Sequence, residues 1–229
     1  MEVKRTEQKF ILTHQESMLL RSRLEAIVPR DRHCDGLLGY DVRSLYFDTV
    51  GDRCCAEKED GLRDHEKIRI RIYGTDTDII KLESKQKRGD AQFKQSLSIS
   101  RQLCDALCRG QYQGLLELQD PLALYFYRKL SEGMMPKVII QYRRVSYCLP
   151  TNSTRITFDY RVRATESSFD LFRPQLNTHP ILPEELVILE VKYNNFLLSY
   201  IKQALRTMGR STSSFSKYFS GRSFYRHYL

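Results

Sequence analysis

Four short stretches of this chain carry charged residues at every second position, and this spacing constrains the fold more than any other feature. The stretches are residues 67–72 (KIRIRI), 81–87 (KLESKQK), 155–159 (RITFD) and 188–192 (ILEVK). Successive side chains of a β-strand point to opposite faces, so each stretch would have one charged face and one mostly apolar face. The pattern therefore predicts strands of one sheet whose surface is dense in Arg and Lys and holds a few carboxylates.

The remaining sequence predicts more strands and a few helices. Strands are expected at residues 3–12, 44–48, 66–73, 78–87, 92–100, 137–148, 154–163 and 186–193, and helices at 18–28, 101–109, 115–132 and 199–208. Thr13 and Glu16 have the spacing of a capping box before the first helix. Charged residues 49–64 and polar residues 166–185 are predicted loops. Together these elements predict an α+β fold, an antiparallel β-barrel or large sheet with flanking helices, and a single domain over residues 1–229.

Net charge limits the choice of partner. The chain has 37 Lys and Arg against 28 Asp and Glu, which gives +9 and a pI near 9.3. This surplus indicates a polyanionic partner, either nucleic acid, a membrane surface or phosphate compounds. No apolar run approaches the ~18 residues that span a bilayer, and residues 1–5 lack the apolar core of a signal peptide. We therefore expect a cytoplasmic protein without a membrane segment.

The charged faces have two interpretations. The polar face of an antiparallel strand often simply meets water. Against this, like charges on neighbouring strands repel, and yet cations predominate here. Arginine, whose planar fork suits phosphate oxygens, is prominent among them. Four acids lie among the cations, as expected of ligands for Mg²⁺ or Mn²⁺ or of groups that orient an Arg: Glu7, Glu83, Asp159 and Glu190. A closed barrel would gather all these groups around one polar lumen.

Several segments in order carry a resemblance to a known family. They are residues 5–10 (RTEQKF), 44–49 (SLYFDT), 67–74 (KIRIRIYG), 82–85 (LESK), 142–143 (YR), 155–159 (RITFD), 190–192 (EVK) and 215–218 (FSKY). With these segments the chain resembles the triphosphate tunnel metalloenzymes, the CYTH-like superfamily. Within that superfamily it is most similar to the polyphosphate polymerase domain of the vacuolar transporter chaperone (VTC) family. The resemblance covers nearly the whole chain.

The resemblance implies a basic tunnel and assigns its residues. Phosphate binding is implied for Lys9, Arg69, Arg71, Lys85, Lys94, Arg143, Arg155, Lys192 and Lys217. Glu190 is implied as the ligand of Mn²⁺ or Mg²⁺, and with Arg69 and Arg71 it would form the catalytic set. Asp159 and Glu83 are candidates for orienting groups. Simpler alternatives stay open: Arg69 and Arg71 as solvent-facing strand residues, Glu190 in a structural ion pair with Lys192, and Lys217 as a surface lysine in a flexible Ser-rich segment.

The implied function is a metal-dependent, polyphosphate polymerase-like phosphotransferase that moves the γ-phosphate of ATP onto a polyphosphate chain. One departure favours this branch over the triphosphatases, which carry ExExK on the first strand. Here Arg5 replaces the first Glu and leaves Glu7 and Lys9. The alternatives are a triphosphatase acting on inorganic or nucleoside triphosphate, with Glu7 as base, and a non-catalytic polyphosphate-binding module.

Two further expectations concern partners. Nucleic acid is not expected, because the sequence contains no recognition helix, zinc finger or RNA-binding signature. The eukaryotic polymerase also carries sensor and membrane parts that these 229 residues do not include. Translocation of a product across a membrane would therefore need a separate membrane partner.

Overall fold

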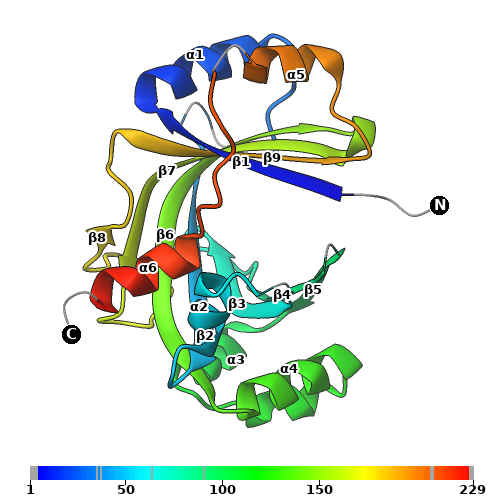
Figure 1. The fold of residues 1–229 in the computed structure, drawn as a ribbon. Coiled ribbons are helices and arrows are strands. Elements are labelled where there is room, and N and C mark those ends of the chain that lie inside the picture. Colours follow the sequence, from blue (N-terminus) through cyan, green and yellow to red (C-terminus); the bar gives the residue numbers. More distant parts are fainter. Residues whose placement is uncertain are drawn as a thin grey trace. The chain divides into compact units, whose positions relative to one another are not determined.

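The computed structural model describes residues 5–34, 36, 38–62, 64–89, 91–206 and 209–226 (Figure 1). Its strands are β1 (Arg5–Thr13), β2 (Tyr40–Thr49), β3 (His65–Tyr73), β4 (Lys81–Arg88), β5 (Ala91–Ser98), β6 (Met134–Leu149), β7 (Thr154–Thr165), β8 (His179–Pro180) and β9 (Leu186–Asn194). Its α-helices are α1 (His14–Glu25), α2 (Arg53–Glu59), α3 (Arg101–Cys108), α4 (Pro121–Ser131), α5 (Ser199–Arg206) and α6 (Lys217–Arg226). Two 3-10 helices are η1 (Gln113–Leu118) and η2 (Thr151–Ser153). Residues 3–4, 207–208 and 227–229, included in the predictions, lie outside the described residues.

The strands form hydrogen bonds in the order β1-β9-β7-β6-β2-β3-β4-β5, and β8 pairs with β7. The registers of β1–β9, β9–β7, β2–β3, β3–β4 and β4–β5 are all antiparallel. The predicted α+β class, an antiparallel sheet with flanking helices, is confirmed. The chain forms two compact units, both built from discontinuous segments, and β6 contributes its first half to one unit and its second half to the other. The prediction of a single domain stays a prediction.

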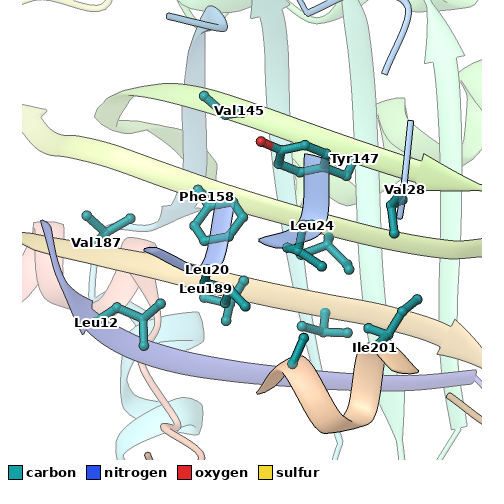
Figure 2. Close-up of a cluster of buried hydrophobic side chains, with 13 residues drawn as sticks. Leu12, Leu20, Leu24, Val28, Val145, Tyr147, Phe158, Val187, Leu189 and Ile201 are labelled. Carbon is teal, nitrogen blue, oxygen red and sulfur yellow. The ribbon is translucent and has the colours of Figure 1, made fainter. Parts of the chain in front are cut away.

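Unit 1 comprises Met1–Asp41, Tyr142–Val162 and Leu182–Phe215. Helices α1 and α5 lie on one face of its strands β1, β9 and β7 (Figure 1). Alternate strand residues such as Leu12, Phe158 and Leu189 point to that face and bury against Leu20 and Leu24 of α1 (Figure 2). Burial of each such side chain stabilises the folded state by about 1.5–3 kcal/mol relative to leaving it exposed. Because strand side chains alternate, the polar residues between them point to the opposite face.

The turn from β1 into α1 is set by the predicted capping box. Thr13 Oγ1 accepts a hydrogen bond from the Glu16 backbone N–H at 3.2 Å, and the Glu16 carboxylate accepts one from the Thr13 backbone N–H at 2.7 Å. Thr13 is therefore both the last residue of the strand and the cap of the helix. This fixes where β1 ends and where α1 begins.

Unit 2 comprises Val42–Gln141, Arg163–Ile181 and Ser216–Leu229. In β3, Ile68, Ile70 and Ile72 are fully buried and alternate with Lys67, Arg69 and Arg71. Phe126 and Leu130 of α4 are fully buried as well, and α4 packs on β5 and η1. The predicted pattern of one apolar and one charged face is therefore present in β3.

Two α-helices of the described residues were not predicted from the sequence. Helix α2 lies in the charged segment that was expected to be a loop, and α6 lies in the segment around Lys217 that was expected to be flexible. Helix α6 is held by tertiary contacts: Tyr218 stacks on Tyr46 with 5.0 Å between ring centroids, and Arg222 pairs with Asp52 at 2.6 Å. The expectation of a flexible segment is wrong for Lys217–Arg226.

Candidate functional site

The charged strand residues of unit 2 share one face, which we call the basic face. It consists of Ser44 and Tyr46 on β2, Lys67, Arg69 and Arg71 on β3, Lys81, Glu83, Lys85 and Lys87 on β4, and Lys94 on β5. Register places them side by side: Arg69 lies opposite Tyr46 and Glu83, and Lys85 lies opposite Lys67 and Lys94. The structure therefore brings together the predicted residues Arg69, Arg71, Lys85 and Lys94.

A single carboxylate holds three cations of the basic face. Glu83, which is 3% exposed, accepts hydrogen bonds on Oε2 from Arg69 Nε at 2.9 Å and Nη2 at 2.7 Å. Arg71 Nη1 lies 4.0 Å from the same oxygen, and Lys94 Nζ lies 2.6 Å from Oε1. Burial alone would raise the pKa of Glu83, but these three cations lower it to about 2. Glu83 therefore contacts the arginines that it was expected to orient, and more positive than negative charge remains beside it.

Tyr46 reports the positive potential of this face. Its hydroxyl accepts a hydrogen bond from Arg69 Nη1 at 3.0 Å, and the Arg69 guanidinium carbon lies 5.7 Å from the centroid of its ring. Burial opposes ionisation of Tyr46, yet Arg69, Arg71 and Lys67 lower its pKa to about 8. A neutral phenol that ionises this easily lies in a field that favours anions.

The pKa of Tyr46 provides a direct test of that field. We expect tyrosinate absorbance near 295 nm to include one group titrating near pH 8 in the free protein, and Tyr46→Phe to remove it. Because a bound polyanion opposes formation of the phenolate, saturating tripolyphosphate should move this pKa upward. Tyr218 is the internal control, since burial and Asp48 raise its pKa far above this range. Titration of Tyr46 at an unchanged pH in the presence of the polyanion would show that the ligand binds elsewhere.

The start of helix α6 lies against the same strands. Tyr218 donates a hydrogen bond from its hydroxyl to the buried Asp48 of β2. Lys67 Nζ donates to Ser216 Oγ at 3.1 Å and lies 5.7 Å from the Tyr218 ring centroid. These contacts place the predicted phosphate ligand Lys217, the half-buried first residue of α6, on an ordered helix of unit 2.

Unit 1 has a polar face of different charge balance. We call this set of residues the polar face. It consists of Glu7 and Lys9 on β1, Glu190 and Lys192 on β9, Arg155, Thr157 and Asp159 on β7, and Arg144 on β6. Register places opposite charges side by side, with Glu7 facing Lys192 and Lys9 facing Glu190. On the other side of β9, Arg155 faces Lys192 and Thr157 faces Glu190. Carboxylates here nearly balance the cations, unlike on the basic face.

Each carboxylate of the polar face contacts a cation. Glu190, which is 8% exposed, lies 3.2 Å from Lys192 Nζ and 3.9 Å from Arg144 Nη2. The two oxygens of Glu7 lie 3.4 Å from Lys9 Nζ and 3.7 Å from Lys192 Nζ. The ion pair between Glu190 and Lys192, considered as a simpler alternative for these residues, is present.

Arg144, which the sequence reasoning passed over, occupies the polar face in place of its neighbour Arg143. Arg144 Nε and Nη2 donate to Asp159 Oδ1 and Oδ2 at 2.7 and 2.8 Å, and both side chains are buried. Burial would lower the pKa of Arg144, but Asp159 raises it well above the usual value. Arg143 alternates to the face of Val145 and donates to the Leu38 carbonyl at 2.8 Å. The structure therefore does not bring Arg143 together with the other predicted phosphate ligands.

Arg155 is on the polar face as predicted, but it is already engaged. Its Nη2 donates to Asp31 Oδ2 and to the Tyr40 hydroxyl, each at 3.1 Å, and its Nε donates to Ser146 Oγ at 3.1 Å. These contacts orient the guanidinium and leave its charge partly offset by Asp31. A role in phosphate binding stays a prediction for Arg155, as it does for Lys9 and Lys192.

Glu190 is the carboxylate of the polar face that the sequence assigns to a metal ion. Among the described residues, no group of three or more His, Cys, Asp or Glu side chains could hold a metal ion. Glu190 would be a single protein ligand, which suits Mg²⁺ when phosphate oxygens and waters complete the coordination. The residues therefore fit a cation that arrives with a phosphate substrate better than a resident metal.

The sequence matches a family model, and the fold is similar to solved structures. A model of the VTC domain matches residues 4–225. A candidate adenylate cyclase from Bacillus halodurans has a similar structure, with 12% identity, a TM-score of 0.51 and 92% of each chain covered. A protein from Pyrococcus horikoshii OT3 has 14% identity, a TM-score of 0.47 and covers 93% of this chain and 95% of its own. A candidate adenylate cyclase from Vibrio parahaemolyticus has 11% identity, a TM-score of 0.47 and corresponding coverages of 93% and 94%.

These structural likenesses concern the fold alone. We found no match among curated proteins. In the part of the chain that the structure describes, no helix is long and apolar enough to cross a membrane. The VTC domain model covers nearly the whole sequence and agrees with the resemblance identified from the motifs. The chain therefore belongs to the VTC domain family.

Proposed function

We propose that this protein is a metal-dependent, polyphosphate polymerase-like phosphotransferase that moves the γ-phosphate of ATP onto a polyphosphate chain. The observation that carries the proposal is the buried Glu83, which holds Arg69, Arg71 and Lys94 on one face. Oriented guanidinium groups bind phosphate oxygens in a bidentate manner, and a row of cations across neighbouring strands suits a linear polyanion. The low pKa of Tyr46 reflects the charge of Arg69, Arg71 and Lys67 and agrees with this assignment.

Phosphoryl transfer requires little covalent chemistry from the protein. A terminal phosphate oxygen of the acceptor forms the new bond to the γ-phosphorus as the bond from that phosphorus to the ADP oxygen breaks, and ADP leaves. The protein has to align the two groups and stabilise charge on the equatorial oxygens. Arg69 and Arg71 are suited to that task because Glu83 fixes their orientation before substrate arrives. Lys85 and Lys94 supply further charge on the same face.

Glu190 is the residue we assign to the metal. Mn²⁺ or Mg²⁺ bound to its carboxylate and to phosphate oxygens would neutralise charge and polarise the transferred phosphoryl group. In the free protein Lys192 and Arg144 hold the carboxylate in place. Their displacement or rearrangement would accompany metal binding.

Triphosphatase activity is the second candidate and is less well supported by the polar face. A hydrolase needs a base for water, whereas an acceptor phosphate is already an anion. Glu7, the expected base, has both oxygens within 3.7 Å of lysine ammonium groups. A binding module without turnover remains the third candidate. We also propose a cytoplasmic location and a separate membrane partner for any translocation of product.

Product analysis tests the proposal. Purified protein is incubated with ATP and Mn²⁺ or Mg²⁺, and products are followed on a polyphosphate-staining gel and in a free-phosphate assay. We expect a ladder of polyphosphate from the wild type and at least about tenfold less from Arg71→Ala, since a hydrogen bond to a charged group contributes about 1.5–3 kcal/mol. Arg128→Ala is the matched control, because Arg128 is an exposed arginine on α4. Free phosphate without a ladder would indicate a triphosphatase, and neither product would indicate a binding module.

A further inference from the structure

Thr157 is a buried hydroxyl for which the free protein provides no hydrogen bond. It lies on β7 between Arg155 and Asp159, and its neighbours Ile156 and Phe158 point to the core on the opposite face. The side chain is 3% exposed, and among the described residues Oγ1 has no hydrogen-bond partner. This contrasts with Thr154 on the same strand, whose hydroxyl donates to the Thr151 carbonyl at 2.9 Å.

An unpaired buried hydroxyl is unfavourable for the folded state. Buried polar groups are nearly always hydrogen-bonded, and valine has the same shape without the polar atom. A threonine is therefore a poor choice at this position for stability alone. Its surroundings indicate what it could bind: Glu190 lies opposite it on β9, and the cations Arg155 and Lys192 lie on the same face.

We propose that the Thr157 hydroxyl donates a hydrogen bond to an oxygen of the bound condensed phosphate, and this inference rests on the proposed function. The cations that would flank this oxygen have side chains only partly covered, with 39% exposure for Arg155 and 28% for Lys192. Part of each side chain is therefore open to solvent, from which a ligand can approach. A phosphate oxygen is favoured as the partner because a hydroxyl can donate to it and because Arg155 and Lys192, on the same face, attract an anion.

Two substitutions at this position separate binding from stability. We measure the Kd of sodium tripolyphosphate by calorimetry in EDTA and again with Mg²⁺, for the wild type, Thr157→Val and Thr157→Ser. Thr157→Val should raise Kd about tenfold in both conditions, whereas Thr157→Ser keeps the hydroxyl and should stay within about threefold. Without ligand, Thr157→Val should raise Tm by about 2–4 °C, because it removes an unsatisfied buried group. A role in packing alone would not weaken ligand binding and at the same time stabilise the free protein.

Each other outcome has a distinct meaning. If the Kd of Thr157→Val equals that of the wild type, this inference is overturned and the proposed function stays intact. Loss of affinity confined to Mg²⁺ would overturn the direct phosphate contact and make the hydroxyl a metal ligand. A lower Tm for Thr157→Val would show that the hydroxyl has a partner in the free protein, which also contradicts the inference. Failure of the wild type to bind tripolyphosphate in either condition would overturn the inference together with the proposed function.

Discussion

Glu190→Gln is expected to reduce metal-dependent transfer from ATP by at least about 100-fold, the scale of losing one charged stabiliser of a transition state. The substitution keeps the size and hydrogen-bonding shape of the side chain and removes its negative charge. Arg144 remains paired with Asp159, so the fold should persist. Initial rates over a range of Mn²⁺ and Mg²⁺ concentrations, together with far-UV circular dichroism, provide the measurement.

Glu7→Gln is the matched control for this experiment. Glu7 is a carboxylate of the same polar face, and it faces Lys192 across the strand pair. In the polymerase hypothesis its loss should change the rate far less than the loss of Glu190. Full turnover by Glu190→Gln with unchanged metal dependence would exclude Glu190 as the ligand. If Glu7→Gln alone abolished phosphate release, the triphosphatase hypothesis would be preferred.

The second large effect is on stability. Asp159→Asn is expected to lower the free energy of unfolding by about 3–5 kcal/mol, because it removes the carboxylate to which the buried guanidinium of Arg144 donates two hydrogen bonds. Asp159 is fully buried, and its two oxygens accept hydrogen bonds from Arg144 at 2.7 and 2.8 Å. Urea denaturation near neutral pH measures the change.

Two comparisons show whether the buried pair is responsible. Replacing both partners with apolar residues of similar size, in Arg144→Met with Asp159→Leu, should recover much of the loss, because no unpaired charge stays buried. Arg143→Met should lower stability by only about 1 kcal/mol, since it removes one hydrogen bond to the Leu38 carbonyl. Equal losses for Arg143→Met and Asp159→Asn would contradict the assigned faces of β6.

Alternation of charge predicted the sheet well because it is a local property of each strand. In β3 the isoleucines and the cations separate cleanly onto two faces, as expected from the sequence. The helices that were missed have a different origin. Helix α6 depends on contacts of Tyr218 with Tyr46 and Asp48, far away in the sequence. A local sequence pattern does not predict contacts between residues so far apart in the chain.

The choice between Arg143 and Arg144 shows the limit of the same reasoning within a strand. Two adjacent arginines satisfy the pattern equally, and the phase of the strand decides which one points to the polar face. That phase is set by packing: Val145 and Tyr147 belong to the core of unit 1, and Arg143 shares their alternation. Thr157 was missed for another reason, because an unpaired hydroxyl is evident only once its surroundings are known.

The shared carboxylate of Glu83 also determines how changes on the basic face combine. Arg69, Arg71 and Lys94 all contact one group, so a change in any of them alters the charge that the others experience. Residues in one such network show coupling free energies of about 0.5–3 kcal/mol. Single substitutions therefore cannot simply be added to describe a multiply altered face. Any redesign of ligand preference therefore has to change these four residues together, as one coupled group.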